Sequence, residues 1–158
     1  GQVTKMLNDK SFDLAFTLGG KGEYSDSSSK LLVSGYLSLF NNSSIKEVKN
    51  ISEINKIPLT MVKGDYYFNK IAKDHMLGKS DNIICQAEAI DVIEYMLKSE
   101  NLKALLPSFI KVSYKSITKI PVTPTIECGI YIIWKDSLTK SVEKEIVTFF
   151  SEYYKDLR

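Results

Sequence analysis

The order of strand-like and helix-like segments is the feature that most limits what this chain can fold into. Short apolar runs of strand length recur along the sequence, and stripes with a period near that of an α-helix separate several of them. The predicted strands are 12–17, 31–40, 57–62, 82–85, 104–107, 112–120 and 128–134, and the predicted helices are 3–7, 65–78, 87–98 and 142–157. Such alternation is typical of α/β proteins, so we expect helices layered on a largely parallel sheet.

Two of the predicted helices have clear ends or faces. Asp65 can cap the start of one helix and Gly78 can end it. The C-terminal helix repeats apolar residues at helical spacing, which predicts a stripe that faces the core. This predicted buried stripe consists of Val142, Ile146, Phe149, Phe150, Tyr153 and Leu157.

Composition and charge exclude several classes of protein. The 158 residues fit one domain or two small lobes, and 44% hydrophobic with 25% charged residues is ordinary for a soluble globular protein. The net charge is +2 and no long basic run occurs, so we expect no DNA contact by this part of a protein. No apolar run approaches the roughly 20 residues of a membrane span, and the N-terminus lacks a secretory signal. We therefore expect a cytoplasmic protein without membrane contact.

The sequence offers no case for an enzyme, a cofactor or a metal. Cys85 and Cys128 lie far apart without metal-ligand spacing, and we expect two buried thiols in a reducing cytosol. His75 is the only histidine, and its place on a helical stripe favours a boundary residue over a catalytic base. No serine elbow, phosphate-binding Walker loop or HExxH motif occurs. We predict no catalytic residues.

Several segments, in the right order, resemble the effector-binding domain of LysR-type bacterial transcription regulators. Phe12–Thr17 (FDLAFT) is similar to the family's strand with Asp second and Ala fourth, and Ile51–Leu59 to its segment leading into the second lobe. Ala87–Leu97 followed by Ala104–Pro107 (ALLP) resembles the helix and strand where the chain returns to the first lobe. The terminal strand and helix within Cys128–Tyr154 match in pattern only.

The resemblance implies a two-lobed α/β fold of the type 2 periplasmic-binding-protein kind. It places residues 1–41 and 112–158 in lobe one and residues 42–111 in lobe two. In the family, a strand, a helix and a second strand precede the helix predicted at 3–7. We therefore expect a chain truncated at its N-terminus, with lobe one incomplete and the DNA-binding helix-turn-helix domain absent.

The resemblance also implies a small-molecule effector bound between the lobes. Thr17 ends a predicted strand before a Gly-rich loop, and Thr60 and Lys63 precede a predicted helix, where backbone N–H groups can hold a carboxylate. We therefore expect an anionic effector. Its predicted contacts are Thr17, Leu18, Gly19, Thr60, Met61, Val62, Lys63, Gly64 and Ile126. In the alternative interpretation these residues form ordinary strand ends and turns, with Lys63 in solvent.

The function predicted from this resemblance is effector sensing by a transcription regulator. Effector binding would alter DNA binding through the absent helix-turn-helix domain, and the full-length protein would be a homo-oligomer. A solute-binding protein of a transport system on the same fold is an alternative, and would require export. A small α/β enzyme is a third hypothesis, and its activity would depend on His75.

Overall fold

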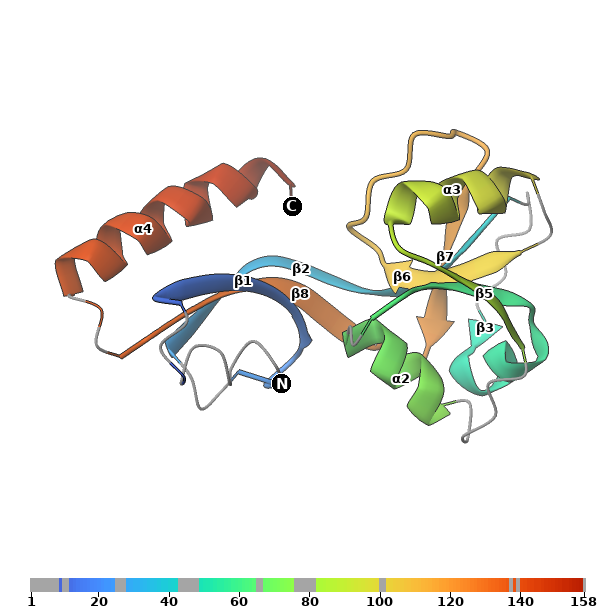
Figure 1. Cartoon of the computed structure of the whole chain (residues 1–158), viewed down its shortest axis with the longest axis horizontal. Coiled ribbons are helices and arrows are strands. Elements are labelled where there is room, and N and C mark those ends of the chain that lie inside the picture. The colour runs from blue at the N-terminus through green and yellow to red at the C-terminus, as the bar shows by residue number, and fades with distance from the viewer. Residues whose placement is uncertain are drawn as a thin grey trace. The chain divides into compact units, whose positions relative to one another are not determined.

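The computed structural model contains two compact units formed by one chain (Figure 1). Unit 1 comprises Gly1–Gly35 and Cys128–Arg158, and unit 2 comprises Tyr36–Glu127. The boundaries fall inside two strands, β2 (Ser28–Asn41) and β8 (Glu127–Trp134). The expected lobe bounds differ from this division in assigning 36–41 and 112–127 to lobe one. The structure describes residues 9, 12–24, 28–42, 49–64, 67–75, 82–99, 102–136, 138 and 140–157.

Unit 1 is built on a sheet with the order β1-β8-β2. Strand β1 (Leu14–Gly20) runs antiparallel to β8, with Leu14 opposite Trp134 and Gly20 opposite Cys128. Apolar side chains are buried on both faces of this sheet, because consecutive residues, which point to opposite faces, are buried in β2 and in β8. The most deeply buried of these side chains are Leu32, Val33, Ile132 and Ile133.

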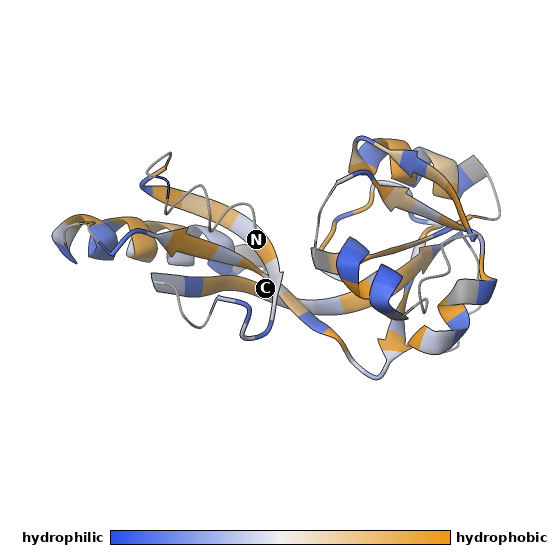
Figure 2. Ribbon diagram, turned by 60° about the horizontal axis from the view of Figure 1, so that its bottom comes forward, coloured by the Kyte–Doolittle hydropathy of each residue, from blue (hydrophilic) through white to orange (hydrophobic). Residues whose placement is uncertain are grey.

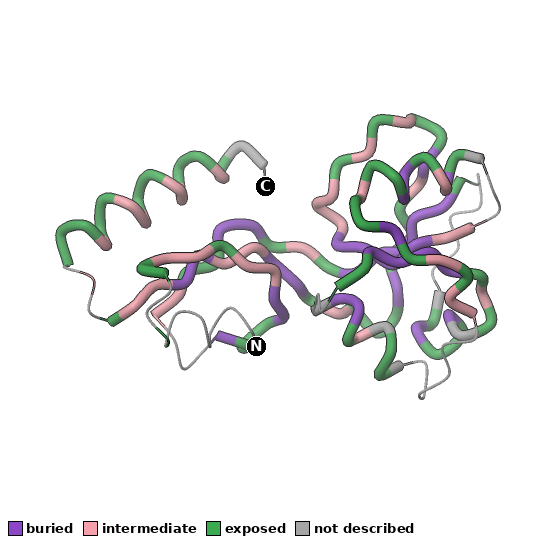
Figure 3. The backbone as a smooth tube through the Cα atoms, in the orientation of Figure 1, coloured by how far each residue is buried: buried purple, intermediate pink, exposed green. Residues whose placement is uncertain are grey.

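The C-terminal helix α4 (Lys140–Tyr153), followed by the 3-10 turn η2 (Tyr154–Leu157), packs on this sheet without burying any residue completely. Its contact with β1 is an edge-to-face pair of Phe16 and Phe150, with ring centroids 4.6 Å apart. The predicted buried stripe is wrong, because Phe149 and Tyr153 are 62% and 64% exposed. Figure 3 shows α4 in green and pink only. Helical periodicity identifies residues that share a face but not what that face covers.

Unit 2 combines a parallel centre with antiparallel flanks. Strand β4 (Leu59–Val62) is parallel to both β5 (Ile83–Ala87) and β6 (Lys103–Pro107). The second part of β2 is antiparallel to β6 and to β7 (Thr118–Thr123), which also pairs with the short β3 (Lys49–Asn50). The expectation of a largely parallel sheet is therefore correct around β4 and for the short β3–β7 pair, and wrong for β2, whose partners β6 and β7 are antiparallel.

Two helices cover opposite faces of the unit 2 sheet. Helix α2 (Tyr67–His75) connects β4 to β5, and α3 (Ile90–Ser99) connects β5 to β6 on the other side of β4. The connection from β4 to β5 and the connection from β5 to β6 run in opposite directions across the sheet. Because such connections are right-handed, their helices lie on opposite faces, as Figure 1 shows. The helices carry both apolar and polar residues (Figure 2), and the 3-10 segment η1 (Ile51–Lys56) precedes β4.

Several predicted bounds need correction. Residues 112–117, predicted as strand, form an irregular loop, because the Glu94 carboxylate accepts the N–H groups of Ser113 and, at 2.8 Å, Tyr114. Strand β1 starts later than predicted and continues to Gly20, since its pairing with β8 extends that far. The predicted helix at 3–7 and the caps Asp65 and Gly78 lie outside the described residues.

Candidate functional site

In unit 1 the predicted contact residues Thr17, Leu18 and Gly19 lie inside β1, opposite Tyr131, Ile130 and Gly129 of β8. The sequence placed Thr17 at the strand end, and that placement is wrong because the strand continues through Gly19 and Gly20. A ligand at this strand could therefore contact the main chain at the end of β1 and the Thr17 hydroxyl.

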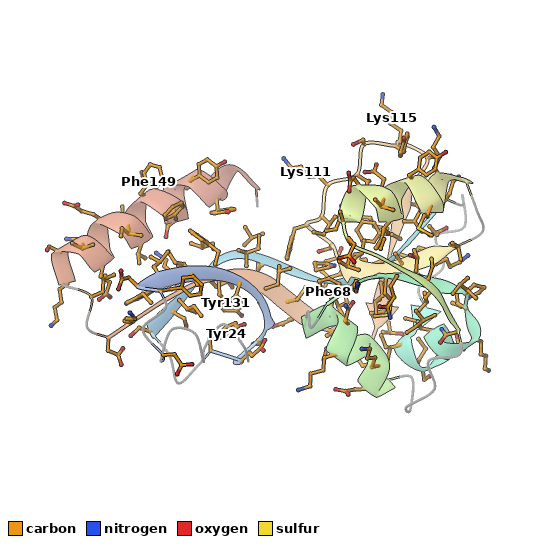
Figure 4. The ribbon with its side chains drawn as sticks, in the orientation of Figure 1. Tyr24, Phe68, Lys111, Lys115, Tyr131 and Phe149 are labelled. Carbon is orange, nitrogen blue, oxygen red and sulfur yellow. The ribbon has the colours of Figure 1, made fainter. Side chains whose placement is uncertain are left out.

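The side chain of Tyr24 covers this part of β1. Its hydroxyl lies 3.1 Å from Thr17 Oγ1 and donates to the carbonyl of Leu18 at 3.3 Å. Its ring centroid is 5.2 Å from that of Tyr131, and the two rings lie together beside β1 in Figure 4. Tyr24 is only 7% exposed, and this burial raises the pKa of its phenol, with the nearby Glu23 charge adding to the effect.

Glu23 and Tyr24 reach the strand because residue 19 is glycine. A Cβ at Gly19 would overlap the Tyr24 ring and lie 2.7 Å from Glu23 Oε2. Glu23 Oε2 accepts the N–H of Gly20 at 3.0 Å, and the Tyr131 hydroxyl donates to the Gly20 carbonyl at 3.3 Å. Sequence reasoning missed both Glu23 and Tyr24, although the Gly-Gly pair was a sign of a close approach.

In unit 2 the side chains of three predicted contact residues lie in the core. Thr60 is fully buried in β4, and its hydroxyl is 3.9 Å from Met96 Sδ of α3. Met61 and Val62 are each 4% exposed. Only the main chain of this strand end, together with the residues that follow it, is therefore available to a ligand.

The turn between β4 and α2 contains the other two predicted residues of this segment. Lys63 Nζ lies 2.8 Å from Glu88 Oε1, with both side chains largely exposed, and the hydrogen bond to Glu88 raises the pKa of Lys63. Gly64 has a φ of 131°, a conformation that favours glycine. The charge that the sequence assigned to an anionic effector is thus already paired within the chain.

Asn69 of α2 fixes the shape of this turn. Its Nδ2 donates to the carbonyls of Val62 at 2.6 Å and Gly64 at 2.8 Å, and the residue is 4% exposed. An amide with two main-chain acceptors holds the end of β4 and the start of α2 together. Nothing in the sequence pattern marked Asn69, because an asparagine in a helix is usually read as a surface residue.

Ile126 lies between β7 and β8 and is half-buried. Its carbonyl accepts the N–H of Leu37 at 2.9 Å. Ile126 and the 60–64 segment belong to unit 2, whereas Thr17, Leu18 and Gly19 belong to unit 1.

The described side chains provide little for catalysis or metal binding. Burial raises the pKa of the Cys128 thiol to about 12, which disfavours the reactive thiolate. Cys85 is only half-buried, which corrects the prediction of two buried thiols. Among the described residues no group of three His, Cys, Asp or Glu side chains could hold a metal ion, and the side chain of His75 is not described. No helix in the described ranges has both the length and the apolar content needed to cross a bilayer.

No protein-family model matches the chain, and no curated protein matches its sequence. Among solved structures, the chain is similar to a full-length OxyR variant from Pseudomonas aeruginosa, at a TM-score of 0.71 and 13% identity over 98% of this chain and 54% of that one. It is also similar to HinK, a LysR family transcriptional regulator from Pseudomonas aeruginosa (TM-score 0.69, 14% identity, 99% of this chain and 57% of that one). The chain thus spans about half the length of these two regulators.

A third similar structure is a phosphate transporter substrate-binding protein with bound phosphate from Clostridium perfringens. Here the TM-score is 0.70 and the identity 11%, over 97% of this chain and 79% of that one. These similar proteins are regulators and a binding protein. The comparisons confirm the predicted resemblance: the chain has the type 2 periplasmic-binding-protein-like α/β fold that is found in the regulatory domains of LysR-family regulators.

Proposed function

We propose that this chain is the effector-sensing domain of a LysR-type transcription regulator. The observation that supports this function best is the fold shared with two such regulators over nearly all of this chain. In the intact protein, effector binding would alter DNA binding by an attached helix-turn-helix domain. The protein would then be cytoplasmic and homo-oligomeric, and it would contact DNA only through that domain.

The proposal assigns effector contact to the main chain of two segments. In unit 1 this is the end of β1 at residues 17–19, and in unit 2 it is the end of β4 with the turn that follows it, residues 60–64. The turn in unit 2 supports such a role because Gly64 and Asn69 hold it in one defined shape. Preformed backbone geometry lowers the entropic cost of binding a small ligand.

A thermal-shift screen with small organic acids and other metabolites tests this proposal. A ligand present at about 100 times its dissociation constant should stabilise the domain by about 2.7 kcal/mol. Gly64→Ala should reduce that stabilisation, because alanine is strained at the φ of 131° that the turn requires.

Asn42→Ala is the control, since it removes one exposed hydrogen bond, to the Lys98 carbonyl, outside both candidate segments. The effector response should survive this change better than it survives Gly64→Ala. A screen in which no metabolite stabilises the folded domain would count against effector sensing. Binding that persists unchanged in Gly64→Ala would move the site away from the β4–α2 turn.

A further inference from the structure

The turn after β1 occupies one main-chain group inside the segment that the proposed function assigns to the effector in unit 1, the Leu18 carbonyl, and one directly after it, the Gly20 N–H. Glu23 presents a carboxylate to the N–H of Gly20, and Tyr24 presents a phenol to the carbonyl of Leu18. We propose that Glu23 and Tyr24 are an internal occupant of this position, which an effector carrying a carboxylate must displace in order to bind. The role of the effector rests on the proposed function, whereas the occupancy itself concerns unit 1 alone.

The Glu23 end of the occupant lies at the surface. A hydrogen bond of 3.2 Å from Glu23 N to Gly20 O closes the turn, and Gly22 adopts a φ of 78° within it. Lys21, Gly22 and Glu23 are exposed, and Gly22 has open space around its Cα. The carboxylate can therefore leave Gly20 by rotation of its own side chain, without opening the core.

The Tyr24 end is anchored. Besides its bonds to Thr17 and Leu18, Tyr24 packs against Tyr131, and its carbonyl accepts a hydrogen bond from Ser29 Oγ at 3.1 Å. The ring fills the space that a side chain at residue 19 would take. The occupant thus has a fixed phenol and a releasable carboxylate, so Glu23 is the part that competes with an external acid.

Competition follows from the chemistry of the Gly20 N–H. A backbone N–H has one hydrogen, so it cannot make a good hydrogen bond to Glu23 and to a second carboxylate at once. The bond to Glu23 is charge-assisted, which makes it stronger than a bond to a neutral acceptor. The negative charge of Glu23 also repels an approaching anion. Removing this side chain should therefore open the position to small carboxylates.

Titration with sodium acetate, followed by the amide resonance of Gly20 in a two-dimensional NMR spectrum, tests the proposal without knowledge of the effector. Sodium chloride keeps the ionic strength constant. We expect a saturable shift of the Gly20 resonance in Glu23→Ala. The wild-type chain should show an apparent affinity for acetate about tenfold weaker, the effect that one net hydrogen bond has on an equilibrium.

Two further variants separate the competing explanations. Glu23→Gln keeps a neutral acceptor at Gly20 and should bind acetate more weakly than Glu23→Ala. Glu53→Ala removes an exposed carboxylate from η1 in unit 2 and should behave like the wild type. Equal acetate binding by wild type and Glu23→Ala would overturn the proposal, as would no binding by either or a gain in Glu53→Ala.

This test and the effector screen fail independently. If the screen finds no effector but acetate binds Glu23→Ala selectively, effector sensing loses its support and the internal occupant stands. If an effector binds while acetate does not distinguish the variants, the internal occupant is wrong and the proposed function stands.

Discussion

The two units use the same elements, a sheet and amphipathic helices, but bury them to different extents. In unit 2, helix α3 buries Ile93 and Leu97 completely, and all four residues of β4 are buried. In unit 1, α4 has no buried residue, and Phe149 and Tyr153 are mostly exposed (Figure 3). Since burial of apolar surface supplies most of the folding free energy, the stability of the chain should reside mainly in unit 2.

The two candidate segments are also held in place by different kinds of contact. The segment of unit 2 follows a fully buried strand and is fixed by Asn69, a buried amide. The segment of unit 1 depends on glycine packing and on the hydroxyl of Tyr24. Changes at the candidate segment of unit 1 should therefore act locally, whereas changes in the core of unit 2 should unfold the unit.

The largest difference in the free energy of unfolding should separate alanine substitutions of two phenylalanines, one in each unit. Phe40 is fully buried in unit 2, so Phe40→Ala should lower the free energy of unfolding by about 3–5 kcal/mol. Phe149→Ala, at a position 62% exposed on α4, should change it by about 0.5 kcal/mol or less. Urea denaturation followed by far-UV circular dichroism measures both. Similar losses would remove the proposed contrast between the units.

Two glycines of unit 1 should differ in the same assay. A Cβ at Gly129 would overlap Leu31 Cδ1 and lie 2.5 Å from the Val33 carbonyl, so Gly129→Ala should cost about 3 kcal/mol. Gly22→Ala meets only backbone strain and should cost about 1 kcal/mol. The fluorescence of Trp134, the single tryptophan, reports on β8 directly. A Gly22→Ala loss as large as that of Gly129→Ala would show that the turn, and not strand packing, limits unit 1.

A pair of asparagines tests the clamp in unit 2. Asn69→Ala removes a buried hydrogen bond to the Val62 carbonyl and a partly buried one to the Gly64 carbonyl, and should cost about 2 kcal/mol. Asn42→Ala removes one exposed bond, to the Lys98 carbonyl, and should cost about 0.5 kcal/mol. Amide hydrogen exchange should rise around the β4–α2 turn in Asn69→Ala only. Unchanged exchange there would mean that Asn69 does not hold the turn.

The smallest effect should come from Tyr24→Phe. Loss of the Tyr24 hydroxyl should lower the free energy of unfolding by about 1 kcal/mol. Because the pKa of Tyr24 is raised above 10.0, the unfolded chain ionises first as the pH rises past that value. Stability therefore falls above pH 10, and Tyr24→Phe should make this fall shallower. If the free energies of unfolding of the wild type and of Tyr24→Phe fell in parallel above pH 10, the claim that the Tyr24 phenol is buried would be wrong.

The fold class could be predicted because its signals are local. Helical stripes and short apolar runs depend on neighbouring residues, so α3 and the strands from β4 to β6 lie close to their predicted positions. The irregular loop at 112–117 could not be predicted, since it depends on Glu94, distant in sequence. The exposed face of α4 could not be predicted either, because periodicity does not specify a partner.

The candidate site was predicted only as a set of positions. The sequence indicated the ends of two strands, but not that Thr60 points into the core or that Glu88 pairs with Lys63. Those facts depend on packing across the sheet. Glu23 and Asn69 were missed for a different reason: each binds main-chain groups a few residues before it, and the turn geometry that brings them together is not visible in the hydrophobic pattern.

The coding sequence upstream of Gly1 tests the central claim most directly. If the chain is the sensing domain of a LysR-type regulator, those codons encode a helix-turn-helix domain and a linker helix ahead of it. An export signal or lipid-anchor sequence in that place would instead make the protein a solute-binding protein on the same fold, and would contradict the regulator assignment.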